Sequence, residues 1–364
     1  MRSLHSIAGL VSGIFILLMS LSGSLLVFHD ELDSLQQPSI TVSKVPSSVS
    51  VDSAFHTVKQ QYPAAQISNC QLPGTANAAF RFTLYDSSHQ KAASPLQVFV
   101  SRQTGAITGT RDAKSFSSSF MNWLSGFHNS FHLHKKGEWL LGFFGIIFLI
   151  SLVTGLILFR GKIAAVLSFK RSVYRWSNLH QLVGVYALLF NLVMGISGVW
   201  MQRYVFKKPF YSGSSWANIV KPTPLPVYSL DSAFAGVKKQ HPDFTAAVIY
   251  FPQRVNGGAT IYGSRSGNSF IHSKKLADYI SLDSTGAVAY TGFVTDIKPS
   301  DRYDIINAQV HFGQYGGWPV KLLYVFFGLT SGLLSITGFC IWLKRKRQNK
   351  SSALSTIKTK NVTI

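Results

Sequence analysis

Charged and thiol side chains are scarce in this sequence. Only 13% of its 364 residues are charged and two are cysteines, whereas 46% are hydrophobic. A soluble protein of this length usually carries more charge, so the composition indicates membrane-embedded segments. The cysteines form no CxxC motif, and Cys70 falls in a predicted outer loop while Cys340 falls in a predicted span. Neither a disulfide nor a thiol redox site is therefore expected.

Motifs for nucleotide cofactors and for covalently attached haem are absent as well. No GxGxxG follows a strand, there is no Walker motif, and there is no CxxCH. A bound haem would therefore be non-covalent, and electrons for any redox reaction would have to come from a separate donor.

Acidic residues are few, with 14 Asp and Glu against 35 Lys and Arg, which gives a net charge of +21. The basic residues concentrate beside apolar stretches, at 160–175 and at 344–347. The positive-inside rule places both segments in the cytoplasm. The charge is therefore a topology signal, and because no groove-reading motif accompanies it, nucleic acid is not an expected partner.

Four stretches are long enough and apolar enough to cross a lipid bilayer, which takes about 20 residues each. Both termini are then expected in the cytoplasm, and the two long loops outside. The four stretches are residues 7–28, 139–159, 182–205 and 322–343.

The sequence contains an internal repeat of two copies. The offset between matched residues grows from 175 near the N-terminus to 183 near the C-terminus. Such a repeat fixes the architecture, and each copy here consists of a span, an outer domain and a second span. The matched residues used below are Leu4-His5 with Leu179-His180, Ser22-Gly23 with Ser197-Gly198, His128 with His311, and Thr154-Gly155 with Thr337-Gly338.

Each outer domain is expected to open with a helix and to continue with short strands. The helices are predicted at 51–62 and 230–241, where the sequence Asp-Ser-Ala-Phe recurs and a proline follows. A helix followed by several short strands is typical of a small α+β module. The predicted strands are 79–85, 96–101 and 106–110 in the first copy, and 246–251, 258–263, 279–282 and 288–290 in the second.

The sequence therefore predicts a membrane all-α four-helix bundle of two tandem repeats with two outer α+β domains. The expected segments are the first span 1–28, the first outer domain 49–115, an outer histidine segment with the second span 128–160, a cytoplasmic loop 161–178, the third span 179–205, the second outer domain 228–295, an outer histidine segment with the fourth span 311–343, and a cytoplasmic tail 344–364.

Four of the eleven histidines occupy matched positions, His5 with His180 at the cytoplasmic edge and His128 with His311 near the outer face. Repeats that each cross the membrane an even number of times are related by an axis along the membrane normal. That axis brings the matched histidines opposite each other. A planar macrocycle between two imidazoles needs one histidine from each side, so the arrangement predicts two b-type haems.

The spacing of the histidines is also compatible with a different metal or with no cofactor. A histidine at a membrane edge is more often an interfacial polar residue than a ligand, and the repeat could simply have copied a helix start. His132 and His134 stand beside His128 and could complete a zinc or copper site, although neither has a histidine as its repeat partner. His29, at the end of the first span, is a candidate substitute ligand or proton carrier at the outer centre.

Several motifs are shared with one known family. They are Leu4-His5-x-x-x-Gly9-Leu10, Phe28-His29-Asp30-Glu31-Leu32, Phe127-His128, Asn178-Leu179-His180-x-x-x-Gly184, His311-Phe312-Gly313, and Thr337-Gly338 through Trp342 to Arg345. With these motifs the chain resembles, over roughly residues 1–347, the PepSY-associated transmembrane proteins, an iron-regulated family of the bacterial inner membrane that includes ferric-siderophore reductases.

The resemblance implies a site and a reaction. It implies two periplasmic PepSY-like domains and two b haems with His5, His180, His128 and His311 as iron ligands, and it adds His29 as a further cofactor-binding residue. The implied activity is an oxidoreductase that reduces a ferric siderophore, or another periplasmic ferric chelate. Electrons would come from a membrane quinol or a cytoplasmic reductase.

A second class of function remains open beside this one. A non-enzymatic membrane module would use its PepSY-like domains to bind a periplasmic protein or peptide, and its spans only as an anchor. A transporter is disfavoured because the spans lack Asp, Glu or Arg along a path. The colour of the purified protein distinguishes the haem-containing reductase from the membrane-anchored binding module, since only the haem protein would absorb visible light.

Overall fold

The computed structural model describes residues 1–36, 49–74, 78–85, 95–167, 174–207, 222–224, 226–254, 256–265, 278–313 and 315–360. Parts of the predicted cytoplasmic loop 161–178 and tail 344–364 lie outside these residues. The chain forms two compact units. The membrane unit comprises Met1–Val27, Phe127–Gly213 and Trp318–Ile364, and the sheet unit comprises Phe28–Gly126 and Ser214–Gly317.

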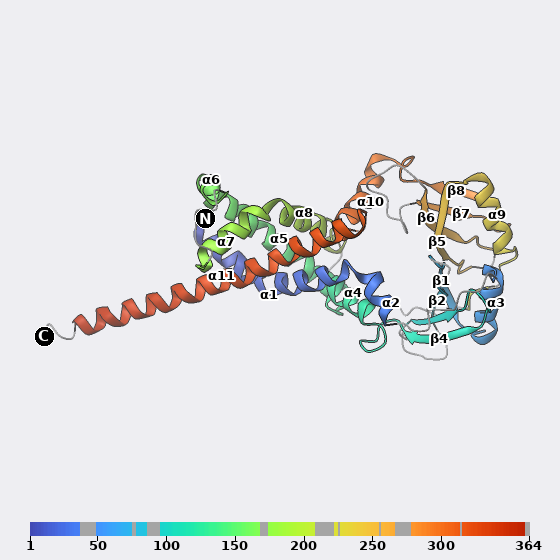
Figure 1. Ribbon diagram of the computed structural model, residues 1–364, viewed down its shortest axis with the longest axis horizontal. Coiled ribbons are helices and arrows are strands. Elements are labelled where there is room, and N and C mark those ends of the chain that lie inside the picture. Colours follow the sequence, from blue (N-terminus) through green and yellow to red (C-terminus); the bar gives the residue numbers. More distant parts are fainter. Residues whose placement is uncertain are drawn as a thin grey trace. The chain divides into compact units, whose positions relative to one another are not determined.

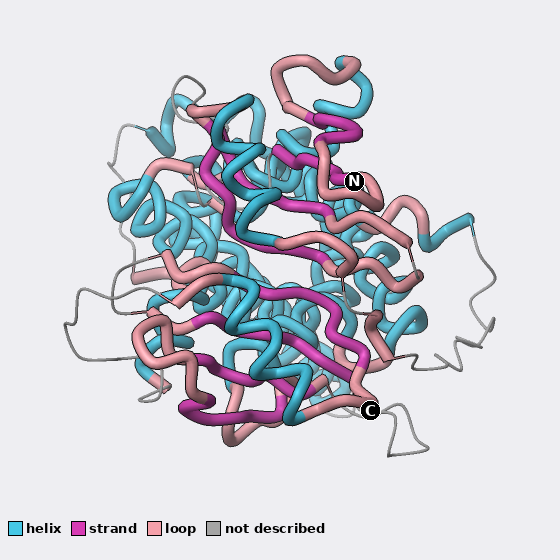
Figure 2. The backbone as a smooth tube through the Cα atoms, turned by 90° about the vertical axis from the view of Figure 1, so that its right-hand side faces the viewer, coloured by secondary structure: helices cyan, strands magenta, loops and turns pink. Residues whose placement is uncertain are grey.

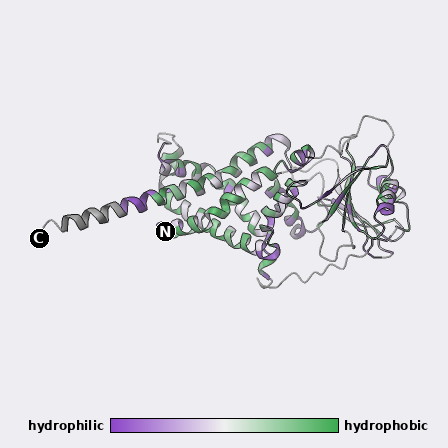
Figure 3. Cartoon of the chain, turned by 90° about the horizontal axis from the view of Figure 1, so that it is seen from below, coloured by the Kyte–Doolittle hydropathy of each residue, from purple (hydrophilic) through white to green (hydrophobic). Residues whose placement is uncertain are grey.

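Long apolar helices make up the membrane unit. Three of them could each cross a bilayer: α1 (Arg2–Leu26), α5 (His134–Phe159), and α11 (Gly317–Lys360) as far as Asn349. Only 22%, 17% and 11% of the most apolar stretch of each helix is buried, as expected for surfaces that face lipid. Figure 3 shows these hydrophobic helices, together with the hydrophilic segment of α11 that follows its apolar part. The protein is therefore a membrane protein.

The third predicted span is broken. α7 (Trp176–Tyr186) and α8 (Leu188–Met201) meet at Ala187, where the chain bends by 67°. Their 11 and 14 residues rise by only about 16 and 21 Å, less than the roughly 30 Å of a hydrocarbon core. The prediction of a four-helix bundle is wrong, because among the described residues a fourth span exists only if this bent pair counts as one. The span was predicted from the hydropathy of its side chains, and hydropathy does not indicate where the helix backbone bends.

Repeat-related contacts hold the membrane helices together. The stacked rings of Phe15 and Phe144 have centroids 3.6 Å apart, and those of Phe190 and Phe327, the matched residues of the second copy, are 5.5 Å apart. Ser20 on α1 donates a hydrogen bond to the Gly328 carbonyl of α11 at 2.8 Å. α1, α5, α8 and α11 accordingly lie side by side (Figure 1).

The two predicted outer domains form a single antiparallel sheet of eight strands in the order β4-β3-β2-β1-β5-β6-β7-β8. β1 pairs with β5, so the prediction of two separate domains is wrong. Each copy alone would expose the backbone of its first strand, and this pairing satisfies both edges. Figure 2 shows the strands following one another without a gap. The strands are β1 (Gln66–Gln71), β2 (Phe80–Tyr85), β3 (Leu96–Val100), β4 (Ile107–Asp112), β5 (Phe244–Tyr250), β6 (Thr260–Arg265), β7 (Asp278–Leu282) and β8 (Val288–Gly292).

One face of this sheet is covered by α3 (Val51–Gln61) and α9 (Leu230–Gln240), which cross in front of the strands in Figure 2. Phe55 on α3 and Val237 on α9 are buried against strand residues. The core strand residues alternate with outward-facing ones, as expected for a sheet with one covered face. They include Ile67, Phe82, Leu84, Val98, Ile249, Ile261 and Ile280.

The aspartates that open α3 and α9 cap each other's helix. The carboxylate of Asp231 accepts hydrogen bonds from the N–H groups of Val51 at 3.0 Å and Asp52 at 3.1 Å. The carboxylate of Asp52 accepts from the N–H groups of Leu230 at 2.8 Å and Asp231 at 3.1 Å, and from the Ser229 hydroxyl at 2.6 Å. The first two free N–H groups of each helix start are therefore satisfied by the other copy, and the third by the helix's own N-cap serine, Ser50 or Ser229.

We expect these crossed caps to lose their stabilising effect in acid. Burial raises the pKa of Asp52, but hydrogen bonds from Ser229 and from two backbone N–H groups outweigh it, so the pKa is lowered overall. The stability linked to a lowered pKa is fully present above the unfolded value of about 3.9 and is lost as the pH falls through the folded value. Asp52→Asn should cost about 1 kcal/mol at neutral pH.

The measurement is the unfolding midpoint of the sheet unit in the intact protein as a function of pH. The wild type should lose more stability below about pH 5 than Asp52→Asn does. Parallel curves for the two proteins would contradict the role assigned to Asp52.

A buried ion-pair cluster lies on the other face of the first copy's strands. Asp33 on α2 (His29–Leu35) accepts two hydrogen bonds from Arg111, at 2.9 and 3.0 Å, and one from Arg81 at 3.0 Å. Arg111 also donates to the Gln97 side chain at 2.7 Å and lies 5.5 Å from the centre of the Phe99 ring. Only 3% of Asp33 and 7% of Arg111 is exposed. This cluster fastens α2 to β2 and β4.

Candidate functional site

His5 on α1 and His180 on α7 lie against each other in the membrane unit. Their ring centroids are 6.1 Å apart and their planes make an angle of 73°. A metal–imidazole bond is about 2 Å long, so two imidazoles on opposite sides of one metal ion have ring centroids about 6 Å apart. The observed separation fits that arrangement.

A backbone carbonyl determines which nitrogen of His5 carries the proton. Nδ1 of His5 lies 2.9 Å from the Ser151 carbonyl oxygen and 3.4 Å from Oγ1 of Thr154. A carbonyl oxygen can only accept, so Nδ1 is the protonated nitrogen and donates to it. The lone pair of Nε2 is then free, which makes Nε2 the nitrogen available to a metal.

His180 is held in the same way by the matched threonine. Its Nδ1 lies 2.8 Å from Oγ1 of Thr337, and the Leu334 carbonyl, the counterpart of Ser151, is also a hydrogen-bond partner. The Thr337 hydroxyl donates its own hydrogen to the Leu333 carbonyl at 2.8 Å. Its oxygen therefore accepts from Nδ1–H of His180, and Nε2 is again the free nitrogen.

A glycine follows each of these threonines and leaves room for the imidazole. A Cβ atom on Gly155 would lie 3.1 Å from Cε1 of His5, and one on Gly338 would lie 3.5 Å from Cε1 of His180. The first distance is tighter than ordinary van der Waals contact. The missing side chains thus let each ring rest against the helix backbone.

His128 on α4 (Phe120–Ser130) repeats the arrangement at another place on α1. Its Nδ1 lies 2.8 Å from Oγ of Ser22, which donates to the Leu18 carbonyl at 2.7 Å. A Cβ on Gly23 would lie 3.0 Å from Cε1 of His128. Ser22 follows His5 by 17 residues, a rise of about 25 Å along the helix. The two places are therefore separated by nearly the thickness of a hydrocarbon core, about 30 Å.

Sequence reasoning did not assign a role to the hydroxyl side chains. We call the dipeptides Ser22-Gly23, Thr154-Gly155 and Thr337-Gly338 the hydroxyl–glycine steps. All three are matched in the repeat, so the signal was present in the sequence. The repeat showed only that these dipeptides occupy equivalent positions in the two copies. The sequence does not show which histidine lies against which hydroxyl–glycine step.

One known family matches nearly the whole chain. The chain matches the family described as the PepSY-associated TM region over residues 2–345, which is nearly its whole length. It belongs to the PepSY-associated TM family. A search of curated proteins found no match. Membership in this family establishes a membrane protein; it does not by itself assign a cofactor or a reaction.

The remaining predicted ligands of this PepSY-associated protein differ in their surroundings. His311 lies on α10 (Pro299–Phe312) in the sheet unit, and burial lowers its pKa to about 4. A neutral imidazole is the form that binds a metal. The pairing of His311 with His128 stays a prediction. Nε2 of His29 lies 3.1 Å from Oδ1 of Asn122, and Nδ1 lies 3.2 Å from Oδ1 of Asp30.

These contacts bear on the roles open to the outer histidines. Both nitrogens of His29 face hydrogen-bond acceptors, which favours a proton carrier over a ligand. His132, in the turn before α5, and His134, the first residue of α5, are exposed and have positive φ angles of 58° and 51°. Within the described ranges no group of three or more His, Cys, Asp or Glu side chains could hold a metal ion. The zinc or copper site considered for His128, His132 and His134 therefore gains no support.

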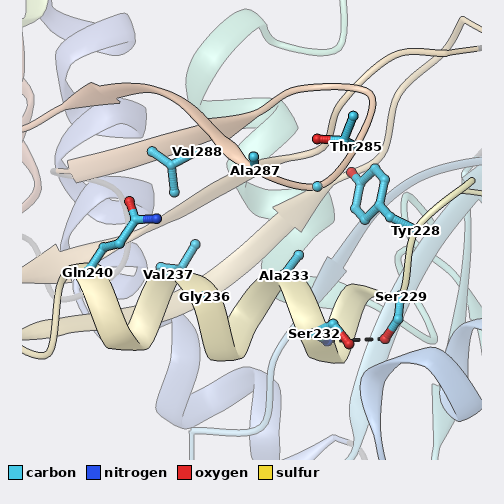
Figure 4. A pocket seen from close by; sticks show the side chains of 11 residues that line it. Tyr228, Ser229, Ser232, Ala233, Gly236, Val237, Gln240, Thr285, Ala287 and Val288 are labelled. Atoms are coloured by element: carbon cyan, nitrogen blue, oxygen red, sulfur yellow. Dashed lines mark hydrogen bonds between the residues drawn. The ribbon is translucent and has the colours of Figure 1, made fainter.

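The sheet unit contains a pocket of about 320 Å³ that holds none of these histidines. It lies between α9 and the turn from β7 to β8, with Tyr228 at one end and Gln240 at the other (Figure 4). The Tyr228 oxygen accepts a hydrogen bond from the Ala259 N–H at 2.9 Å. Neutral side chains line the pocket, and none of them is a histidine, cysteine, aspartate or glutamate.

Proposed function

We propose that this protein binds two b haems and passes electrons across the bacterial inner membrane to ferric siderophores, or to another ferric chelate, in the periplasm. The observation that carries the proposal is the opposed pair His5 and His180, each with Nδ1 engaged and Nε2 free. Haem would supply one-electron transfer at this position. His128 would be a ligand of the second haem.

The reaction balances with one electron for each ferric ion. A ferric chelate takes up one electron and becomes ferrous, and the ferrous ion binds hard oxygen ligands more weakly and is released. A membrane quinol would give two electrons and two protons and would therefore serve two ferric ions; a cytoplasmic reductase is the other class of donor. The basic segments at 160–175 and 344–347 support a cytoplasmic location of the His5–His180 end.

The test is the absorption spectrum of the detergent-purified protein, first oxidised and then reduced with dithionite. We expect a sharp reduced α-band and, in a pyridine haemochrome assay, about two b haems per chain. The reduced protein should reoxidise when a ferric chelate is added, with ferrous ion captured by a coloured chelator. A colourless protein after expression with added haem would contradict the proposal and leave a membrane-anchored binding module.

A further inference from the structure

We propose that the hydroxyl–glycine steps are positioning elements that fix the tautomer and the approach of the haem-binding imidazoles, and thereby set the reduction potential of each haem. This inference rests on the proposed function. Partners of the second ring nitrogen fix the orientation of a metal-bound histidine and raise its basicity. The steps would supply those partners from three different helices.

The first support is the recurrence of one geometry. At His5, His180 and His128, Nδ1 lies 2.8 to 3.4 Å from a serine or threonine oxygen. Each hydroxyl donates its hydrogen to the carbonyl four residues earlier in its own helix. The oxygen of each step is therefore oriented as an acceptor for an imidazole N–H. A serine or threonine hydroxyl in a helix can donate to a carbonyl of the same helix without any histidine nearby, so the histidine at each step is an additional partner.

The second support is burial beside a missing side chain. Ser22, Thr154 and Thr337 are 3%, 5% and 0% exposed. At such positions an unpaired N–H would be costly, so the hydroxyls of Ser22 and Thr337 hold His128 and His180 in one tautomer, as the Ser151 carbonyl holds His5. The neighbouring glycine allows the ring to reach that hydroxyl, since a Cβ would meet Cε1 of the imidazole at 3.0 to 3.5 Å.

The two threonine steps differ in a way that allows a matched comparison. At His180 the Thr337 hydroxyl is an acceptor at 2.8 Å. At His5 the Ser151 carbonyl, at 2.9 Å, is nearer than the Thr154 hydroxyl, at 3.4 Å. Removing the hydroxyl should therefore disturb His180 strongly and His5 weakly, although the two positions are repeat counterparts.

The expected direction follows from the charge of the iron. Donation from Nδ1–H makes the imidazole a more electron-rich ligand, which stabilises ferric more than ferrous iron. Thr337→Val keeps the shape of the side chain and removes the acceptor. It should shift the ferric–ferrous equilibrium of one haem about tenfold toward the ferrous form, which is about 59 mV upward for one electron. Thr154→Val should shift it less than half as far, and Thr337→Ser should keep the wild-type value.

The experiment is a redox titration of the α-band in the purified full-length protein, with the low-spin electron paramagnetic resonance spectrum of the oxidised haems as a second readout. Ser22→Ala should move the potential of the other haem and leave the first unchanged. Loss of one haem in Thr337→Val with retention in Thr337→Ser would also support the inference, because only the hydroxyl distinguishes the two.

Full haem content with unchanged potentials in Thr337→Val and Ser22→Ala would overturn the inference while leaving the proposed function intact. Equal effects of Thr337→Val and Thr337→Ser would overturn it too, because the position would then act through packing and not through its hydroxyl. A wild-type protein without haem would instead contradict the proposed function, and this inference with it.

Discussion

Replacing His180 by alanine should remove one of the two haems that we propose for this protein. A b haem is held without a covalent bond, so its axial histidines provide much of its attachment. In the structure His180 lies opposite His5 with Nε2 free, and alanine has no atom that could take its place. We expect the haem content of His180→Ala to fall to about half of the wild-type value, with His5→Ala giving the same result.

Pyridine haemochrome content per chain is the measurement, and His29→Ala is the matched control. His29 also lies at the end of a predicted span, but its two nitrogens contact Asn122 and Asp30, so His29→Ala should keep both haems. His128→Ala should lose the haem that His180→Ala keeps. Full haem content in both His5→Ala and His180→Ala would show that this pair of histidines holds no haem.

The second large effect concerns stability. Asp33→Ala should destabilise the sheet unit by about 3 to 5 kcal/mol, the usual result of removing one partner from a buried ion pair. Without Asp33, the guanidinium groups of Arg81 and Arg111 would lie close together with no anion between them. Arg111→Ala should cost less, because Asp33 would retain Arg81. Arg81→Ala should cost least, because the two bonds between Arg111 and Asp33 would remain.

Chemical unfolding of the purified protein, followed by a signal from the sheet unit, gives these free energies. The control is Asp243→Ala, which breaks the pair between Asp243 and Arg265 at 2.6 Å. About a third of each of these side chains is exposed, so solvent screens the pair and the loss should be clearly smaller than in Asp33→Ala. Equal losses in Asp33→Ala and Asp243→Ala would show that the buried cluster contributes no more than a surface pair.

Local elements of this chain could be predicted from its sequence, because each leaves a local signal. The helices α3 and α9 begin at the repeated Asp-Ser-Ala-Phe and end before a proline, as predicted. Seven of the eight strands lie within two residues of the predicted ranges. The strand that was missed, β1, is the one that joins the two copies. Its central residues Ser68-Asn69 interrupt the apolar pattern on which strand prediction depends.

Long-range features of the fold could not be predicted, because they depend on which surfaces meet. Each copy looked complete by itself, so the sequence did not indicate that β1 and β5 would pair. No proline marks the bend at Ala187, and Gly184, three residues before it, resembles the other glycines of the predicted spans. The repeat singled out His5 and His180 as well as Thr154 and Thr337, but only the structure shows that the threonines lie beside the histidines.

The crossed aspartate caps and the shared sheet have a consequence for a single copy. One copy alone leaves the edge of its first strand unpaired, and it has one aspartate whose partner is the other copy's helix and one histidine of each matched pair. Two identical copies related by a twofold axis would supply each other with the missing strand partner, helix cap and second histidine. A chain of half this length would therefore need a second copy beside it to pair this strand edge and to cap this helix, as in a symmetric dimer. The two copies are not identical, because one carries the buried arginines and the other the pocket.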